Sequence, residues 1–122
     1  MKAAPVMEPQ DLEFETLQRE YLASATRKIE TLRGLFDSLA PEPTSSDLLE
    51  PLRDAFHRIA GTGGLFGFPE ISRCARSAEV EIAALLDDGV TLDAPILRKL
   101  EGAIDELEST FASQGSAASA TL

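Results

Sequence analysis

The only histidine of the chain, His57, is the residue with the clearest potential for chemistry. A neutral imidazole nitrogen is a nucleophile near neutral pH, and a phosphoryl group that it accepts stays reactive enough to be passed on. On a helical wheel, the apolar neighbours of His57 occupy an arc centred well away from it. These neighbours are Leu48, Leu49, Leu52, Ala55, Phe56, Ile59 and Ala60. The pattern therefore predicts a nucleophile on the exposed face of a helix rather than a buried core histidine.

Two glycines share this predicted face with the histidine. Gly61 and Gly64 lie within about 40° of His57 on the wheel, one and two turns further along the chain. A glycine inside a helix costs about 1 kcal/mol relative to alanine, and an ordinary solvated face gains nothing from that cost. Bare backbone would instead leave room for a phosphoryl group and for a docking protein. A plainer alternative is that the helix ends near Ala60 and the glycines form a loop.

Polar residues around the histidine are candidate contacts for a phosphate or a docking partner. Arg58 is adjacent in sequence, Arg53 lies one turn earlier on the same face, and Thr62 has a hydroxyl to offer. Thr62 could equally make only a local backbone bond. The two arginines could be ordinary solvated residues, Arg53 paired with Glu50 or Asp54.

The N-terminal half of the chain is expected to form two of the helices that position the histidine. Residues 1–10 are predicted to be a flexible lead, after which Asp11 can cap a first helix that the following prolines stop. Its inward positions are expected to be Phe14, Leu17, Tyr21, Ile29, Leu32, Leu35, Phe36 and Leu39. Ser45 or Ser46 can cap the second helix, which is expected to run from Asp47 into the glycines.

The C-terminal half is expected to supply two more helices. Pro69 suits the first turn of the third, an Asp-Gly pair at 88–89 ends it, and Asp93 can cap the fourth. No segment alternates with period two, so strands are not expected. Short connections between four amphipathic helices predict an all-α fold, an antiparallel up-and-down four-helix bundle over 11–112, with the exposed histidine on its second main helix. The small, polar segment 113–122 is predicted to be a disordered tail.

The charge of the chain disfavours several classes of partner. A net charge of −10 opposes binding to nucleic acid or to anionic membranes, and no apolar run is long enough to span a bilayer. The stretch from Arg53 to Arg76 holds four arginines and two acidic residues, so it carries +2 while the remainder carries −12. The N-terminus lacks the apolar core of a secretory signal, and Cys74 is the only cysteine. A reducing, cytoplasmic location is expected.

The run FHRIAGTGGLFGFPEIS at 56–72 resembles the signature of histidine-containing phosphotransfer (HPt) domains, a histidine followed by x-x-K-G and a later glycine. The matching residues are His57, Gly61 and Gly67. The resemblance implies a four-helix bundle that exchanges phosphate with the aspartate of a receiver domain, in a response regulator or a hybrid histidine kinase, or accepts it from a kinase. It also implies a phosphocarrier without ATP binding, kinase activity or a cofactor of its own. The receiver would hold the divalent metal.

One residue departs from the signature, and it leaves a second interpretation open. Ala60 stands at the lysine position, and the nearest cation is Arg58, about 100° from the histidine on the wheel. The alternative function is an adaptor or inhibitor that binds a receiver or kinase without carrying phosphate. A nucleotide-binding loop is disfavoured because GTGGLFG lacks both the G-K-[S/T] ending and the G-x-G-x-x-G spacing. One histidine and one cysteine are too few ligands for a typical zinc site.

Overall fold

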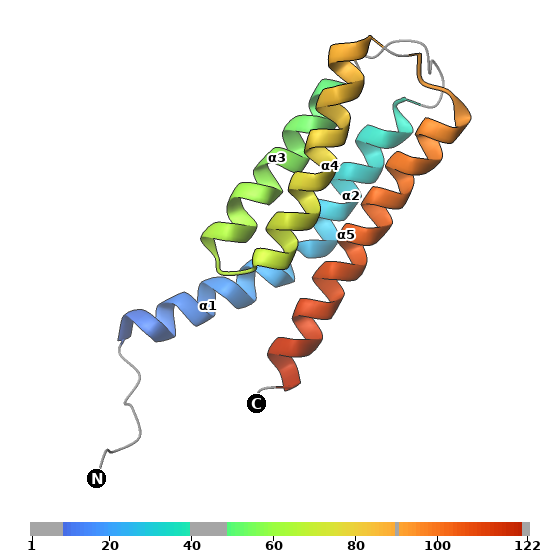
Figure 1. Ribbon diagram of the computed structural model, residues 1–122. Coiled ribbons are helices and arrows are strands. Elements are labelled where there is room, and N and C mark those ends of the chain that lie inside the picture. Colours follow the sequence, from blue (N-terminus) through green and yellow to red (C-terminus); the bar gives the residue numbers. More distant parts are fainter. Residues whose placement is uncertain (1–8, 40–48, 90, 121–122) are drawn as a thin grey trace.

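The computed structural model describes residues 9–39, 49–89 and 91–120, and Figure 1 shows a bundle of helices. The helices are α1 (Pro9–Ala23), α2 (Ala25–Asp37), α3 (Leu49–Leu65), α4 (Pro69–Asp88) and α5 (Ala94–Ala120). From α2 to α5 the chain runs alternately up and down, and α1 leaves the bundle at an angle (Figure 1). The described ranges contain no strand. The predicted all-α, antiparallel four-helix bundle is confirmed, with α1 as an additional helix.

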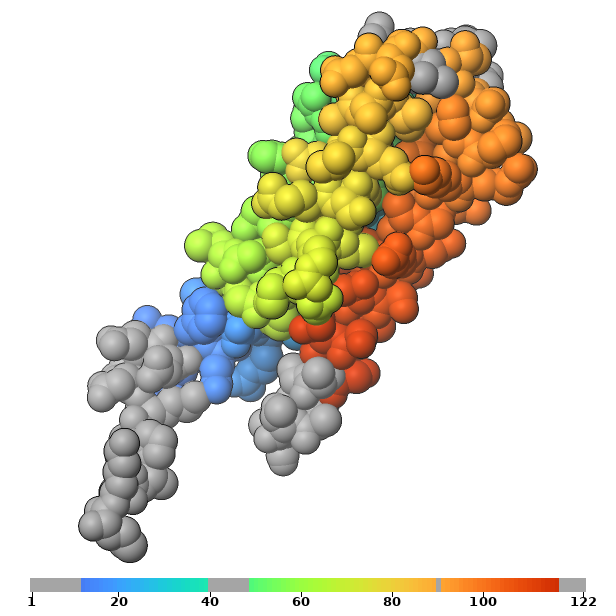
Figure 2. Space-filling view, viewed as in Figure 1, coloured from blue at the N-terminus to red at the C-terminus, as the bar shows by residue number. Residues whose placement is uncertain are grey.

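Four helices enclose a single apolar core. Both α3 and α5 pack against α2 and α4. The backbone of α1 comes close to α2 and α5, and its Tyr21 side chain also reaches α3. Figure 2 shows α4 between α3 and α5 on one face of the molecule. The largest fully buried side chains are Leu32, Leu39, Leu49, Leu52, Phe56, Ile71, Ile82, Leu92, Leu100, Ile104 and Leu107. Most of them recur every three or four residues, which is the spacing that places one stripe of each helix against its neighbours.

The predicted first helix is wrong in one respect, because the chain forms two helices that meet at Ser24. The Ser24 hydroxyl donates to the carbonyl oxygen of Tyr21 at 2.6 Å, and the Ser24 amide bonds to the same oxygen at 3.1 Å. A serine that bonds back to the preceding turn competes with the regular helical ladder and bends the helix. Phe14 and Leu17, which were expected to face the core, are 40% and 44% exposed on the α1 arm.

Both predicted ends of the folded region also need correction. Helix α1 begins at Pro9, two residues before the predicted cap Asp11, because proline is well tolerated in the first helical turn. Helix α5 runs through the predicted disordered tail as far as Ala120. This segment contains no proline and is rich in alanine, the strongest helix former. Residues 1–8, the caps predicted at 45–46, the start at Asp47 and residues 121–122 lie outside the described part.

Both predicted ends of α4 and the predicted start of α5 are confirmed. Pro69 opens α4, and Gly89 ends it with a left-handed φ of 60° and an amide that bonds to Leu85 and Leu86. The side chain of Asp93 accepts a hydrogen bond from the Ile96 amide at 3.0 Å and so caps α5. These local signals set the direction in which α4 and α5 cross the bundle.

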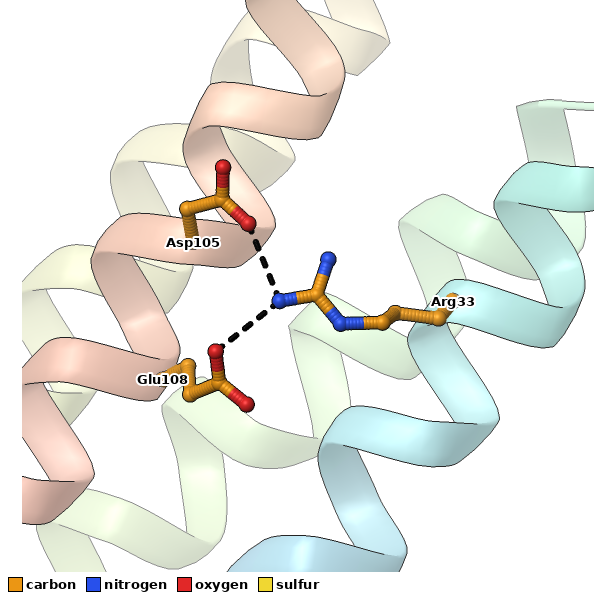
Figure 3. A network of polar contacts seen from close by, with 3 residues as sticks. All are labelled: Arg33, Asp105 and Glu108. Carbon is orange, nitrogen blue, oxygen red and sulfur yellow. Dashed lines mark hydrogen bonds and ion pairs between the residues drawn. The ribbon is translucent and has the colours of Figure 1, made fainter.

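An ion-pair network joins α2 to α5 (Figure 3). The guanidinium of Arg33 lies 2.9 Å from Asp105 and 3.0 Å from Glu108, and its hydrogen bond to Asp105 raises the pKa of Arg33. All three side chains are partly or largely exposed, so water and salt weaken the attraction. We expect Arg33→Ala to lower the free energy of unfolding by about 0.5 to 1 kcal/mol in dilute buffer.

Chemical denaturation at low and high salt checks this expectation. Most of the difference between Arg33→Ala and the wild type should disappear at high salt, because added ions screen the pair. Arg98→Ala is the control, since Arg98 is an exposed cation of α5 with no carboxylate partner among the described residues. If the free energy of unfolding of Arg33→Ala is lowered equally at low and high salt, then packing of the aliphatic part of the Arg33 side chain, and not its charge, is responsible.

Candidate functional site

The imidazole of His57 stands on the outer surface of α3 next to α4. Its side chain is 67% exposed, whereas its chain neighbour Phe56 is fully buried in the core. The Nδ1 atom of His57 lies 2.7 Å from Oε1 of Glu79, a residue of α4. The ring is therefore both accessible to a partner and held on one side by the neighbouring helix.

The carboxylate of Glu79 determines which ring nitrogen is free. An ionised carboxylate only accepts hydrogen bonds, so the proton of a neutral His57 ring must reside on Nδ1 in this contact. The second nitrogen, Nε2, then carries the lone pair that a nucleophile needs. Glu79 is only 21% exposed, and its other oxygen, Oε2, is buried without a hydrogen-bond partner in the described part of the chain. Leaving a buried acceptor unpaired is costly, which points to a role beyond stability.

Glu79 could not be recognised as part of the site from the sequence alone. It is one of twenty-one acidic residues, and it belongs to a different helix from the histidine. The only signal was its place beside Ala78 in the predicted third helix, close to the apolar stripe. The register between two helices determines its contact with the imidazole, and helical periodicity does not contain that information.

Small residues bring α3 and α4 close enough for this contact. A Cβ added to Gly63 would lie 3.0 Å from Cγ2 of Ile71 and 3.1 Å from the backbone nitrogen of Ser72. The Ser72 hydroxyl donates to the carbonyl oxygen of Ala60 across the helix interface at 2.7 Å. The bare backbone at Gly63 permits the close approach, and the Ser72 hydrogen bond helps to hold the register of the two helices.

The turn between α3 and α4 depends on Gly67. Its φ of 82° is left-handed, a conformation that glycine adopts without strain. The Gly67 amide bonds to the carbonyl of Gly64 at 3.1 Å, and the Phe68 amide bonds to that of Gly63 at 2.7 Å. This is the Schellman pattern that ends a helix and satisfies its last carbonyl groups. It turns the chain sharply, so that α4 returns antiparallel along α3 and carries Glu79 back to the level of His57.

The glycines next to His57 lie in the helix and not in a loop. Helix α3 continues to Leu65, so the alternative that it ends near Ala60 is wrong. Gly61 and Gly64 are both exposed. A Cβ added to Gly61 would meet nothing within 4 Å beyond the neighbouring backbone of its own helix, and one added to Gly64 would make ordinary contact with Ser72. The surface beside the imidazole is thus open, because these two exposed positions carry no side chain.

Alanine at two glycines of α3 should have opposite effects on stability. At Gly61 the new methyl group enters open space and improves helix propensity, so Gly61→Ala should stabilise the fold by up to about 1 kcal/mol. At Gly63 it meets α4, and its closest backbone contact cannot rotate away. Gly63→Ala should therefore destabilise the fold by about 1 to 3 kcal/mol. Urea denaturation measures both changes, and a shift of the same sign in the two variants would contradict the close packing at Gly63.

The two candidate arginines take different positions around His57. Arg53 lies 3.7 Å from Glu50 and 3.6 Å from Asp54, the two acidic residues that the sequence offered as its partners. Arg58 is exposed and borders an open groove between α2 and α3, with a volume of about 320 Å³. Lys28 also borders this groove. Arg58 therefore stands on the α2 side of α3, whereas Glu79 approaches from α4.

The hydroxyl of Thr62 is occupied within the protein. It donates to the carbonyl of Arg58 at 2.9 Å, which is the local backbone bond that the sequence left open. It also lies 2.9 Å from the hydroxyl of Tyr21. Burial raises the pKa of Tyr21, so its hydroxyl stays protonated, and either of the two hydroxyls can be the donor in this contact. Through this bond the end of α1 is attached to the last turn of the helix that carries the histidine.

Comparison with known proteins assigns the chain to a family. The family model described as "Hpt domain" matches residues 16–110, whereas no curated protein and no solved structure matches the chain. Within the described ranges, none of the helices combines the length and the apolar character needed to cross a membrane. The match spans most of the bundle and confirms the resemblance seen in the sequence. The chain belongs to the Hpt domain family, whose members have a phosphotransfer role in two-component signalling.

Proposed function

We propose that His57 is the phosphoacceptor of a phosphorelay. One observation carries the proposal, namely the exposed imidazole whose Nδ1 is held 2.7 Å from a carboxylate of the neighbouring helix. In this arrangement Nε2 is the free nitrogen, on a side chain that is 67% exposed to solvent and partners. An ordinary surface histidine has no need of a partly buried carboxylate partner.

The proposed step is an in-line transfer between two nucleophiles. The lone pair of Nε2 attacks phosphorus, the P–O bond of a receiver's aspartyl phosphate breaks, and the aspartate carboxylate leaves with the electron pair. The imidazole becomes positively charged as the new N–P bond forms. The carboxylate of Glu79 stabilises that charge through Nδ1–H. Transfer to a second receiver is the same step in reverse, so the chain acts as a carrier between receivers or from a histidine kinase to a receiver.

The surface around His57 suits an acidic partner that must approach closely. The chain carries −10 overall, but the stretch 53–76 carries +2 and can steer an acidic active site toward the histidine. Gly61 and Gly64 leave the backbone bare where the partner would dock. This docking surface would be bordered on either side by Arg53, Arg58 and Thr62. We place the exchange in the cytoplasm, a reducing compartment in which a lone thiol such as Cys74 stays unpaired.

Phosphoryl transfer from a labelled receiver tests the proposal. A panel of receivers is phosphorylated with radioactive phosphate, purified and mixed with the chain, and the label on the chain is followed over time. We expect label that acid removes and base preserves, because a phosphoramidate is acid-labile. Peptide mapping should then place the label on the segment that contains His57.

Two outcomes would count against the proposal. If receivers bind the chain and none transfers phosphate, the chain is better described as an adaptor or inhibitor that carries no phosphate. If label is transferred but survives acid, it sits on a hydroxyl or another group, and His57 is not the acceptor.

A further inference from the structure

Arg76 is an exposed arginine of α4, one turn before Glu79. Ser72, Arg76 and Glu79 are spaced by four and three residues, so they lie along one stripe of the helix. The first of them bonds to the Ala60 carbonyl and the last to His57, each at 2.7 Å. Because α3 and α4 are antiparallel, these two contacts bracket Arg76 and place it between the levels of Ala60 and His57, within one turn of the imidazole.

The other arginines of the basic stretch are already engaged or stand elsewhere. Arg53 pairs with Glu50 and Asp54, and Arg73 is 2.7 Å from Glu70. Arg58 borders the groove toward α2. Within the described ranges, Arg76 has no carboxylate within ion-pair distance. It is therefore the cation on the α4 side of His57 that is free to bind an anion.

A phosphoryl group on Nε2 of His57 would need such a cation. It would carry up to two negative charges, next to the Glu79 carboxylate and in a chain whose net charge is already −10. Ala60, the residue before Gly61, is 1% exposed and contributes no charge. The long side chain of Arg76 can extend over bare backbone, since nothing occupies the space beside Gly61. Its guanidinium can then bind two phosphoryl oxygens at once.

We propose that Arg76 binds the phosphoryl group carried by His57 and stabilises it during transfer. The inference rests on His57 being the phosphoacceptor. It assigns the phosphate-binding cation to α4, the helix that also supplies Glu79, and not to the helix that carries the histidine. One helix face would then serve both nitrogens of the ring: Glu79 holds Nδ1, and Arg76 binds what Nε2 carries.

The test uses two phosphate donors, a phosphorylated receiver and the small molecule phosphoramidate. Phosphoramidate transfers its phosphoryl group to Nε2 with loss of ammonia and needs no docking surface. We expect Arg76→Gln to slow labelling of His57 by about tenfold or more with both donors, the loss typical of a hydrogen bond to a charged group. Arg76→Lys should recover part of the rate, because it restores the charge without the bidentate geometry.

Arg73→Gln is the matched control, an exposed arginine one turn earlier on the same helix that is paired with Glu70. It should label within about twofold of the wild type. Phosphorus NMR of the phosphorylated chain gives a readout that a purely structural role would not move. Loss of Arg76 should raise the pKa of the phosphoryl group, because a nearby cation favours its dianionic form.

The outcomes separate this inference from the proposed function. If wild type and Arg76→Gln label at the same rate with both donors, the inference is wrong and the role of His57 stands. If Arg76→Gln is slow only with the receiver, Arg76 contacts the partner and not the phosphate, which also overturns the inference. If His57 of the wild type accepts phosphate from neither donor, both proposals fail.

Discussion

A chain with His57→Gln is expected to take no acid-labile phosphate from any receiver, while its fold and its binding to receivers persist. Glutamine has no nitrogen lone pair that can attack phosphorus, because its amide nitrogen is not nucleophilic. Its NH₂ group can still donate to Oε1 of Glu79, so the carboxylate keeps a partner. The site is 67% exposed, and such surface substitutions usually change stability by less than about 0.5 kcal/mol.

Three measurements on this variant separate a phosphocarrier from an adaptor. Labelling should be abolished, thermal unfolding should match the wild type, and titration with a receiver should give a similar affinity. In cells, the output of the pathway should be lost although the complex still forms. An inhibitor that works by binding alone would keep its full effect with glutamine at this position. That result would move the function to the adaptor class.

The fold was largely predictable because its signals are local. Pro69, Gly89 and Asp93 act within one helical turn, and the structure places both ends of α4 and the start of α5 where they indicate. The break at Ser24 escaped prediction because the apolar spacing continues across it. A hydroxyl bonded to the Tyr21 carbonyl redirects the chain there, and periodicity does not register that competition.

The candidate site was predictable only on the helix that carries the histidine. A helical wheel places His57 and Gly61 on one outward face, and that is where the structure has them. The partner carboxylate comes from another helix, whose register depends on the turn at Gly67 and the close packing at Gly63. Both glycines were visible in the sequence. Glu79 is 22 positions from the histidine in the sequence, and only the three-dimensional arrangement shows that these glycines bring it to the imidazole.

Removal of the carboxylate in Glu79→Ala should slow phosphorylation of His57 by about tenfold to hundredfold, the range typical when a carboxylate that orients a metal-binding histidine is removed. Two effects combine. The ring loses the acceptor that keeps its proton on Nδ1, and the positive charge that develops during attack loses its compensation. Glu79→Gln should be intermediate, because its amide oxygen still accepts from Nδ1–H but carries no charge.

The stability of the same variant shows whether Glu79 is present for the fold or for the chemistry. One carboxylate oxygen is buried without a partner in the described residues, a situation that costs about 1 to 3 kcal/mol. Glu79→Ala should therefore unfold no earlier than the wild type, and a higher melting temperature would agree with relief of that cost. The matched control is Glu81→Ala, which removes a carboxylate of the same helix that pairs with Lys99 of α5 at 2.7 Å and not with the imidazole.

The combination of slower transfer with undiminished stability is what separates the alternatives for Glu79. A residue retained for packing or for an ion pair would lose stability when it is removed, and transfer would fall only in proportion to the unfolded fraction. Removal of a residue that orients the nucleophile would instead slow the transfer and leave the stability undiminished. If Glu79→Ala transfers phosphate as fast as Glu81→Ala, the contact with Nδ1 is incidental. The accessibility of His57 and the bare backbone beside it would then be enough to explain the reactivity of the site.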